Sequence, residues 1–207
     1  MDITFNVHDG ESTRQVTHVD LKEFATFYGL DRIAKDRYSA LFTLNLMLLE
    51  KKSGIDPFQI IEEIRALEGG RASRQTKAES QFKGKHLKGL WHKHFMPAMP
   101  SIIAHNIMNH LGKNGTRKIV EEVLNPEKYP IVTKEILDEL THRIVIGSME
   151  ERASQQKLTG EWIVFAKENG ANYYLGLWSH NAGDESIAGS IKSACVREFP
   201  FLAQYFP

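Results

Sequence analysis

Residues 161–178, EWIVFAKENGANYYLGLW, carry the clearest structural pattern in the chain. Its two halves are rich in β-branched and aromatic residues, which favour β-strands. Asn169-Gly170 separates the halves, and this dipeptide favours a two-residue turn between antiparallel strands. We therefore expect strands at 161–166 and 172–178, joined as a hairpin.

A second hairpin is expected at the other end of the chain. Residues 3–7 alternate apolar and polar side chains, which is the period of a half-buried strand, and 15–19 form its expected partner. Between the hairpins, apolar residues repeat at helical spacing, most clearly over 32–52 and 57–67. The sequence thus predicts class α+β and a single domain over 1–207. We expect both hairpins to form one small antiparallel sheet, packed with a mostly helical middle region.

The composition is that of a soluble globular protein, with 42% apolar and 25% charged residues. It excludes a disordered chain, a collagen-like fibre and a disulfide-rich mini-protein. Cys195 stands alone, so no intramolecular disulfide forms, which indicates a reducing compartment. Residues 1–6 do not resemble a secretory signal, and the longest apolar stretch, 41–49, is too short to span a bilayer. We expect a cytoplasmic protein with no membrane partner.

Basic residues are concentrated in the segment 71–118. The whole chain has 26 Lys and Arg against 26 Asp and Glu, yet this segment holds ten basic residues and one acid, Glu79. Such asymmetry favours an anionic partner, either RNA or DNA, or an acidic protein; the segment could also lie across acidic residues of its own chain. The candidate anion-binding and nucleic-acid-binding residues are Arg71, Arg74, Lys85, Lys88, Lys93, Asn106, Lys113 and Arg117.

Five of the nine histidines also lie in this basic segment. His92 and His94 are two residues apart, so an extended backbone places both rings on one side, whereas a helix separates them by about 200°. Two neutral imidazoles on one side could bind a metal ion if a third ligand came from elsewhere. No third ligand follows at a recognisable spacing, so the sequence assigns no metal ligands and no cofactor.

His105 and His180 complete the set of candidate catalytic residues. A helical wheel over 102–111 places His105, Asn106, Asn109 and Lys113 on an open face and Ile103, Ala104, Ile107, Met108 and Leu111 on the core face. An imidazole beside amides and a cation suits phosphate chemistry, although a solvated helix face has the same composition. His180 follows the last expected strand, where a rigid sheet often positions functional side chains.

These patterns predict a nucleic-acid-binding or nucleic-acid-processing protein. Its catalytic form is a small metal-independent RNase, in which His92, His94, His105 or His180 transfers protons and Arg and Lys stabilise the phosphate charge. One alternative is a non-enzymatic regulatory or interaction module whose basic segment binds an acidic partner. Another is a metallohydrolase coordinated by His92 and His94. The sequence leaves open whether the protein is an enzyme, and which oligomeric state it adopts.

Overall fold

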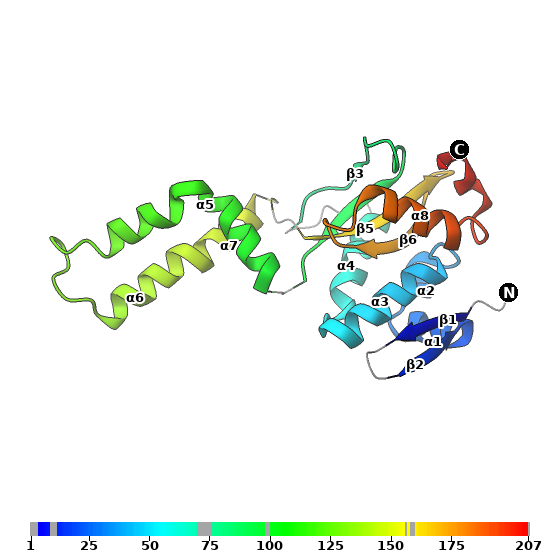
Figure 1. The fold of residues 1–207 in the computed structure, drawn as a ribbon, viewed down its shortest axis with the longest axis horizontal. Coiled ribbons are helices and arrows are strands. Elements are labelled where there is room, and N and C mark those ends of the chain that lie inside the picture. The colour runs from blue at the N-terminus through cyan, green and yellow to red at the C-terminus, as the bar shows by residue number, and fades with distance from the viewer. Residues whose placement is uncertain are drawn as a thin grey trace. The chain divides into compact units, whose positions relative to one another are not determined.

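The structure is a computed structural model, and it describes residues 4–8, 12–69, 76–97, 100–155, 157 and 160–206. The chain divides into two compact units. Unit 1 comprises residues 1–72, 78–95 and 161–207, and unit 2 comprises 73–77 and 96–160. Helices and strands are both abundant, which confirms class α+β (Figure 1). One domain over the whole chain stays a prediction.

Unit 1 begins with the expected amino-terminal hairpin. Strands β1 (Thr4–His8) and β2 (Thr13–Thr17) pair in antiparallel register. Helix α1 (His18–Phe27) follows directly, because the Thr17 hydroxyl accepts a hydrogen bond from the Asp20 N–H while the Asp20 carboxylate accepts one from the Thr17 N–H. This reciprocal capping starts the helix at residue 18.

The helix expected over 32–52 is two helices, α2 (Leu30–Ala34) and α3 (Ala40–Ser53). Within the intervening segment, residues 35–36 form a turn and 37–39 run alongside β6, where the Ser39 N–H donates to the Tyr174 carbonyl over 2.9 Å. Tertiary pairing with a strand thus overrides the helical periodicity of the segment. Helix α4 (Pro57–Glu68) begins as expected, with the Asp56 carboxylate accepting from the Phe58 N–H.

The main sheet has four antiparallel strands in the order β3-β4-β5-β6. The strands are β3 (Ser80–Gln81), β4 (Trp91–Phe95), β5 (Glu161–Glu168) and β6 (Ala171–Trp178). The prediction that both hairpins share one sheet is wrong, because β1 and β2 form a separate two-stranded sheet. The carboxyl-terminal hairpin instead pairs with β4, which comes from the basic segment and whose residues 93–95 are buried.

Helices cover both faces of the four-stranded sheet (Figure 1). Helix α8 (Asp184–Ala194) and the 3-10 helix η2 (Pro200–Tyr205) close one face. Their core includes Leu90, Val164, Leu175, Ile187 and Leu202. Helices α3 and α4 contact the other face, and the N-terminal hairpin packs on α1 and α3 through a smaller cluster. The sheet is therefore a rigid support for side chains at its ends.

The secondary-structure elements in the described part of unit 2 are helices, joined by turns and loops. It contains α5 (Pro100–Val123), α6 (Lys134–Thr141), the π-helix η1 (His142–Ile146) and α7 (Gly147–Ser154). Gly112 has φ +64° and ψ −169°, which interrupts α5 directly after 102–111, the range to which the helical wheel was applied. Among the described helices of both units, none combines the length and the apolar character needed to cross a bilayer.

Candidate functional site

His92 and His94 lie on β4, so the backbone under them is extended. Their rings project from the same side of the strand, as the two-residue spacing predicts, with ring centroids 5.4 Å apart. His92 contacts Phe82, which belongs to the core on the α8 side of the sheet. The intervening Lys93 contacts Glu63 of α4, on the opposite side.

The register of the sheet brings His180 to the same place. His94 is opposite Trp162 on β5, and Trp162 is opposite Trp178 on β6. His180 follows Trp178 by two residues, and its Nε2 lies 3.3 Å from Nδ1 of His94. The two rings stack with centroids 5.0 Å apart and an interplanar angle of 22°. We call His92, His94 and His180 the histidine cluster.

Aromatic and polar neighbours fix the rings of the histidine cluster. Trp162 packs against both His92 and His180, with ring centroids 5.3 and 4.3 Å away. Ser80 is opposite His92 in the β3–β4 register, which places its Oγ 3.2 Å from His92 Nε2. These contacts hold the imidazoles in set orientations, which a proton-transfer site requires.

Glu161 places a carboxylate beside the cluster. Its Oε2 accepts a hydrogen bond from the backbone N–H of His180 over 3.1 Å, which ties the residue after β6 to the start of β5. Burial raises the pKa of Glu161 above its usual value, and the hydrogen bond from His180 opposes that rise. The carboxylate therefore anchors the loop that carries His180.

Exposure of the cluster increases from one ring to the next. His94 is only 6% exposed, His92 is half-buried and His180 is exposed. Two imidazoles at hydrogen-bond distance share one proton, so one ring donates while the other accepts. The arrangement can pass a proton between a shielded ring and a ring that a substrate reaches.

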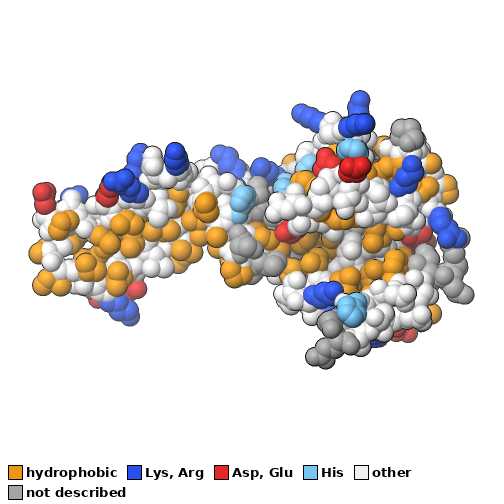
Figure 2. All heavy atoms as spheres, viewed as in Figure 1, with side chains coloured by type: hydrophobic (Ala, Val, Ile, Leu, Met, Phe, Trp, Pro, Cys, Tyr) orange, Lys and Arg blue, Asp and Glu red, His pale blue; other side chains and the backbone are white. Residues whose placement is uncertain are grey.

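A turn rich in cations precedes the cluster along the chain. Lys83, Lys85, His86 and Lys88 lie between β3 and β4, and all four are exposed; we call them the basic turn. Figure 2 shows Lys and Arg side chains gathered at the edge of unit 1 where Figure 1 places this turn. Trp91 is the first residue of β4, and His94 is three positions further along. The distance along the strand between them is about 10 Å. The cations of the basic turn thus come just before the strand that carries His92 and His94.

Two predicted anion contacts are buried, which corrects their placement on the surface. Lys93 is 2% exposed, and its Nζ lies 3.1 Å from Oε2 of Glu63. The alternation of β4 that turns both histidines to one side turns Lys93 to the other, against α4. Lys93 is therefore a buried ion-pair residue, out of reach of a nucleic acid.

Asn106 is fully buried, so the predicted open face of its helix is wrong. Its side chain donates to the Ile102 carbonyl over 3.0 Å and accepts from Nε of Arg152 over 3.1 Å. Met108 is 70% exposed, although the wheel places it in the core. A hydrogen-bonded amide can occupy a core position, and a wheel weighted by polarity alone does not detect this.

The remaining candidates are distributed over the chain. His105, Lys113 and Arg117 are exposed on α5 of unit 2, so His105 is not part of the histidine cluster. Nε of Arg117 is 2.7 Å from Oε1 of Glu121 on the same helix. Arg71 and Arg74 lie outside the described residues. Lys85 and Lys88 are the predicted anion contacts that the basic turn retains.

Sequence reasoning missed four neighbours of the cluster, namely Ser80, Phe82, Glu161 and Trp162. Ser80, Glu161 and Trp162 reach the histidines through strand pairing, and Phe82 directly follows β3, so their roles depend on how separate segments pair. From the sequence alone, Trp162 is a strand-forming residue of the expected hairpin. Its position at the start of the predicted hairpin was the available signal, because strand ends often carry functional residues.

Over the described residues, no group of three or more His, Cys, Asp or Glu side chains has an arrangement that could hold a metal ion. Comparison with known protein families, curated proteins and solved structures finds no match for this chain.

Proposed function

We propose that unit 1 binds nucleic acid and cleaves RNA without a metal ion. The observation that carries this proposal is the contact between His94 and His180, at 3.3 Å, beside His92 on one face of the sheet. In this arrangement His180 and His92 supply the proton acceptor and the proton donor that phosphodiester cleavage needs, while His94 orients His180. The exposed basic turn, which directly precedes β4, supplies positive charge for the RNA phosphates.

The proposed reaction uses the ribose 2′-hydroxyl as the nucleophile. His180, the exposed ring, takes the 2′-hydroxyl proton while the 2′-oxygen bonds to phosphorus. The bond from phosphorus to the 5′-oxygen breaks, and that oxygen takes a proton from a protonated His92. The products are a 2′,3′-cyclic phosphate and a free 5′-hydroxyl. His94 acts as a positioning residue, since its Nδ1 sets the orientation of the His180 ring.

The first test is cleavage of a labelled single-stranded RNA by the purified protein in excess chelator. We expect His180→Ala to lower the cleavage rate by about 100-fold or more, which is the usual contribution of a general acid or base. His105→Ala is the matched control, because His105 is an exposed histidine outside the cluster, and it should cleave at the wild-type rate. A DNA probe of the same sequence should bind and stay intact, because it lacks the 2′-hydroxyl.

The second test addresses the basic turn. Reversing Lys85 and Lys88 to Glu should weaken RNA binding at every sequence. It should also reduce the salt dependence of binding, by about 0.7 in the log–log slope for each lost phosphate contact on a single strand. Lys93→Glu is unsuitable for this comparison because Lys93 is buried.

The alternatives predict different results in these tests. Binding without cleavage in every condition supports the non-enzymatic module. Cleavage that appears only when a divalent metal is added supports the metallohydrolase. Absence of nucleic-acid binding at moderate salt contradicts the proposal and leaves an acidic protein as the partner of the basic turn.

A further inference from the structure

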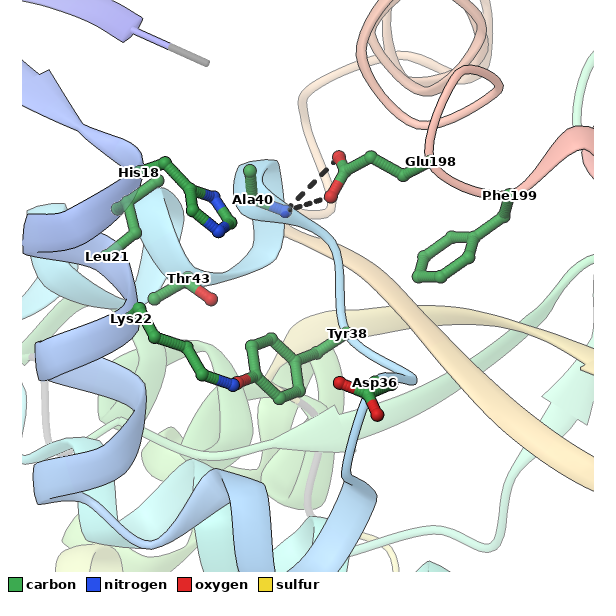
Figure 3. Close-up of a pocket in the computed structure, with 9 residues that line it drawn as sticks. All are labelled: His18, Leu21, Lys22, Asp36, Tyr38, Ala40, Thr43, Glu198 and Phe199. Atoms are coloured by element: carbon green, nitrogen blue, oxygen red, sulfur yellow. Dashed lines mark hydrogen bonds between the residues drawn. The ribbon is translucent and has the colours of Figure 1, made fainter. Parts of the chain in front are cut away.

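Unit 1 contains an open pocket that shares no residue with the histidine cluster or the basic turn. It lies between α1, the segment that leads into α3, and residues 198–199, and its volume is about 440 Å³ (Figure 3). Pockets of this size accept small organic molecules. The side chains that decide which molecule are His18, Lys22, Asp36, Tyr38, Glu198 and Phe199.

Glu198 brings a desolvated carboxylate to this pocket. Both of its carboxylate oxygens accept from the Ala40 N–H, at 3.0 and 3.2 Å, at the start of α3. Burial raises the pKa of Glu198, and the Ala40 hydrogen bond opposes the rise. No Lys, Arg or His of the described segments forms an ion pair with Glu198. A half-buried carboxylate without a countercharge favours a cation from outside.

Asp36 brings a second carboxylate to the same space. Its φ of +58° lies in the left-handed region, which is strained for a residue other than glycine. Figure 3 shows its carboxylate at the wall of the pocket beside Tyr38. Asp36 likewise makes no ion pair with any residue that the structure describes.

The ammonium group of Lys22 does not compensate these two carboxylates. Its Nζ lies 2.6 Å from Oδ1 of Asp31 and 3.1 Å from the Tyr38 hydroxyl. The charge of Lys22 is thus balanced by Asp31, which leaves Asp36 and Glu198 against His18 alone. An anionic ligand would face net negative charge in this pocket.

Aromatic rings complete the environment of a cation site. Tyr38 and Phe199 both line the pocket (Figure 3), and the Lys22 ammonium already lies 5.6 Å from the centroid of the Tyr38 ring. Aromatic faces attract ammonium groups, and carboxylates bind them by charge-assisted hydrogen bonds. We propose that this pocket binds a small organic cation carrying one or more ammonium groups.

The test measures binding of diaminobutane to the full-length protein by calorimetry, with butanediol as the neutral probe of the same length. Wild type should bind diaminobutane saturably and should not bind butanediol. Glu198→Gln and Asp36→Asn remove one charge each with little change of shape, and each should weaken binding by about tenfold or more. Glu185→Gln is the matched control, since Glu185 is exposed on α8 outside the pocket, and it should bind as wild type does.

Each result decides the proposal. Gln at position 198 still offers a carbonyl oxygen to the Ala40 N–H, so the fold is expected to persist; if it does not, Asp36→Asn carries the test. Equal binding of diaminobutane and butanediol, undiminished binding by both pocket variants, or no saturable diaminobutane binding in the millimolar range overturns it. His180→Ala should bind diaminobutane normally, so this outcome is independent of RNA cleavage.

Discussion

Lys93 on β4 and Glu63 on α4 form an ion pair in the protein interior. Lys93 is 2% exposed and the Glu63 side chain is 13% exposed. Burial lowers the pKa of Lys93, while the nearby Glu63 carboxylate favours the charged ammonium. A buried charge of this kind is tolerated only while its partner is present.

We expect removal of one partner to be far more harmful than removal of both. Lys93→Met should reduce the free energy of unfolding by about 3–5 kcal/mol, because it leaves the Glu63 carboxylate buried without its cation. The double variant Lys93→Met, Glu63→Leu should regain most of that loss. Urea unfolding of the wild type, Lys93→Met, Glu63→Leu and the double variant measures the coupling, and strictly additive effects would contradict the paired-charge explanation.

Asp31 carries a pH dependence whose sign follows from its contacts. Burial alone would raise the pKa of Asp31, but hydrogen bonds from Lys22, Tyr38 and Thr26 outweigh it and lower the pKa from 3.8 to about 2. A carboxylate with a lowered folded-state pKa stabilises the fold above its unfolded pKa. That contribution is lost as the pH falls from about 4 towards 2.

Asp31→Asn should therefore flatten the acid side of the stability profile. Below about pH 4, the wild type should lose stability faster than the variant as acid is added. Urea midpoints measured across this range test the expectation. Asp36→Asn is the control, because Asp36 forms no ion pair with the described residues, and a profile for Asp31→Asn that parallels wild type would refute the assignment.

At the scale of elements, two glycines with open surroundings should respond in opposite directions to the same substitution. Gly112 interrupts α5 with φ +64°, whereas Gly189 lies inside α8, and an added Cβ meets nothing within 4 Å at either position. Gly112→Ala should destabilise unit 2 by about 1–3 kcal/mol through backbone strain alone. Gly189→Ala should stabilise by up to about 1 kcal/mol, because alanine favours a helix. Thermal melting compares them, and equal shifts would argue against the assigned conformations.

Local chemistry accounts for the elements that the sequence predicts. The turn Asn169-Gly170 and the β-rich residues on either side belong to one short segment, and β5 and β6 form as expected. The prediction of one shared sheet failed because the pairing of strands depends on contacts between residues far apart in the sequence. The sequence offers no local indication that 161–168 would pair with 91–95 instead of the N-terminal hairpin.

The sequence likewise predicts some features of the candidate site and not others. The approach of His92 and His94 follows from a two-residue spacing, so the sequence predicts it once the strand is extended. The arrival of His180 depends on three strands and on a register shift at Val164 and Phe165, which no local pattern encodes. The wheel failed at Asn106 for another reason, since the hydrogen bonds with Ile102 and Arg152 outweigh its polarity.

At the scale of the whole molecule, the unit boundary divides the basic segment. Unit 1 carries 16 Lys and Arg against 18 Asp and Glu, and unit 2 carries 10 against 8. The net charge of +9 over 71–118 is thus a property of a chain segment that crosses between units. Local clusters such as the basic turn, and not the total charge of the segment, determine what each unit attracts.

The strand pairing also shows that residues 96–160 of unit 2 are inserted in the chain between two paired strands of unit 1. Phe95 ends β4, Glu161 begins β5, and these two residues are directly paired. Because paired residues are close enough for a tight turn, a short Gly-containing loop should replace 96–160 without disturbing the sheet. We expect the shortened protein to unfold cooperatively and to retain any RNA cleavage by the histidine cluster.

Circular dichroism and thermal melting of the shortened protein test this expectation. Helical signal should fall, because α5, α6, η1 and α7 are removed, while a single cooperative transition remains. A shortened protein that aggregates or melts without a transition would show that unit 1 needs unit 2 to fold. A variant in which only the loop 125–132 is shortened is the control. It shows whether a shorter loop by itself changes the melting behaviour.

The insertion has a consequence for how the chain reaches its fold. Pairing β4 with β5 closes a loop of 65 residues, 96–160, and for a flexible chain this costs about 2–3 kcal/mol more entropy than a four-residue turn. If unit 2 folds first, it brings residues 95 and 161 together. The entropy cost of closing the loop is then met before β4 and β5 pair. The helices of unit 2 then determine how quickly the histidines, which all depend on β4 and β5, come to share one face.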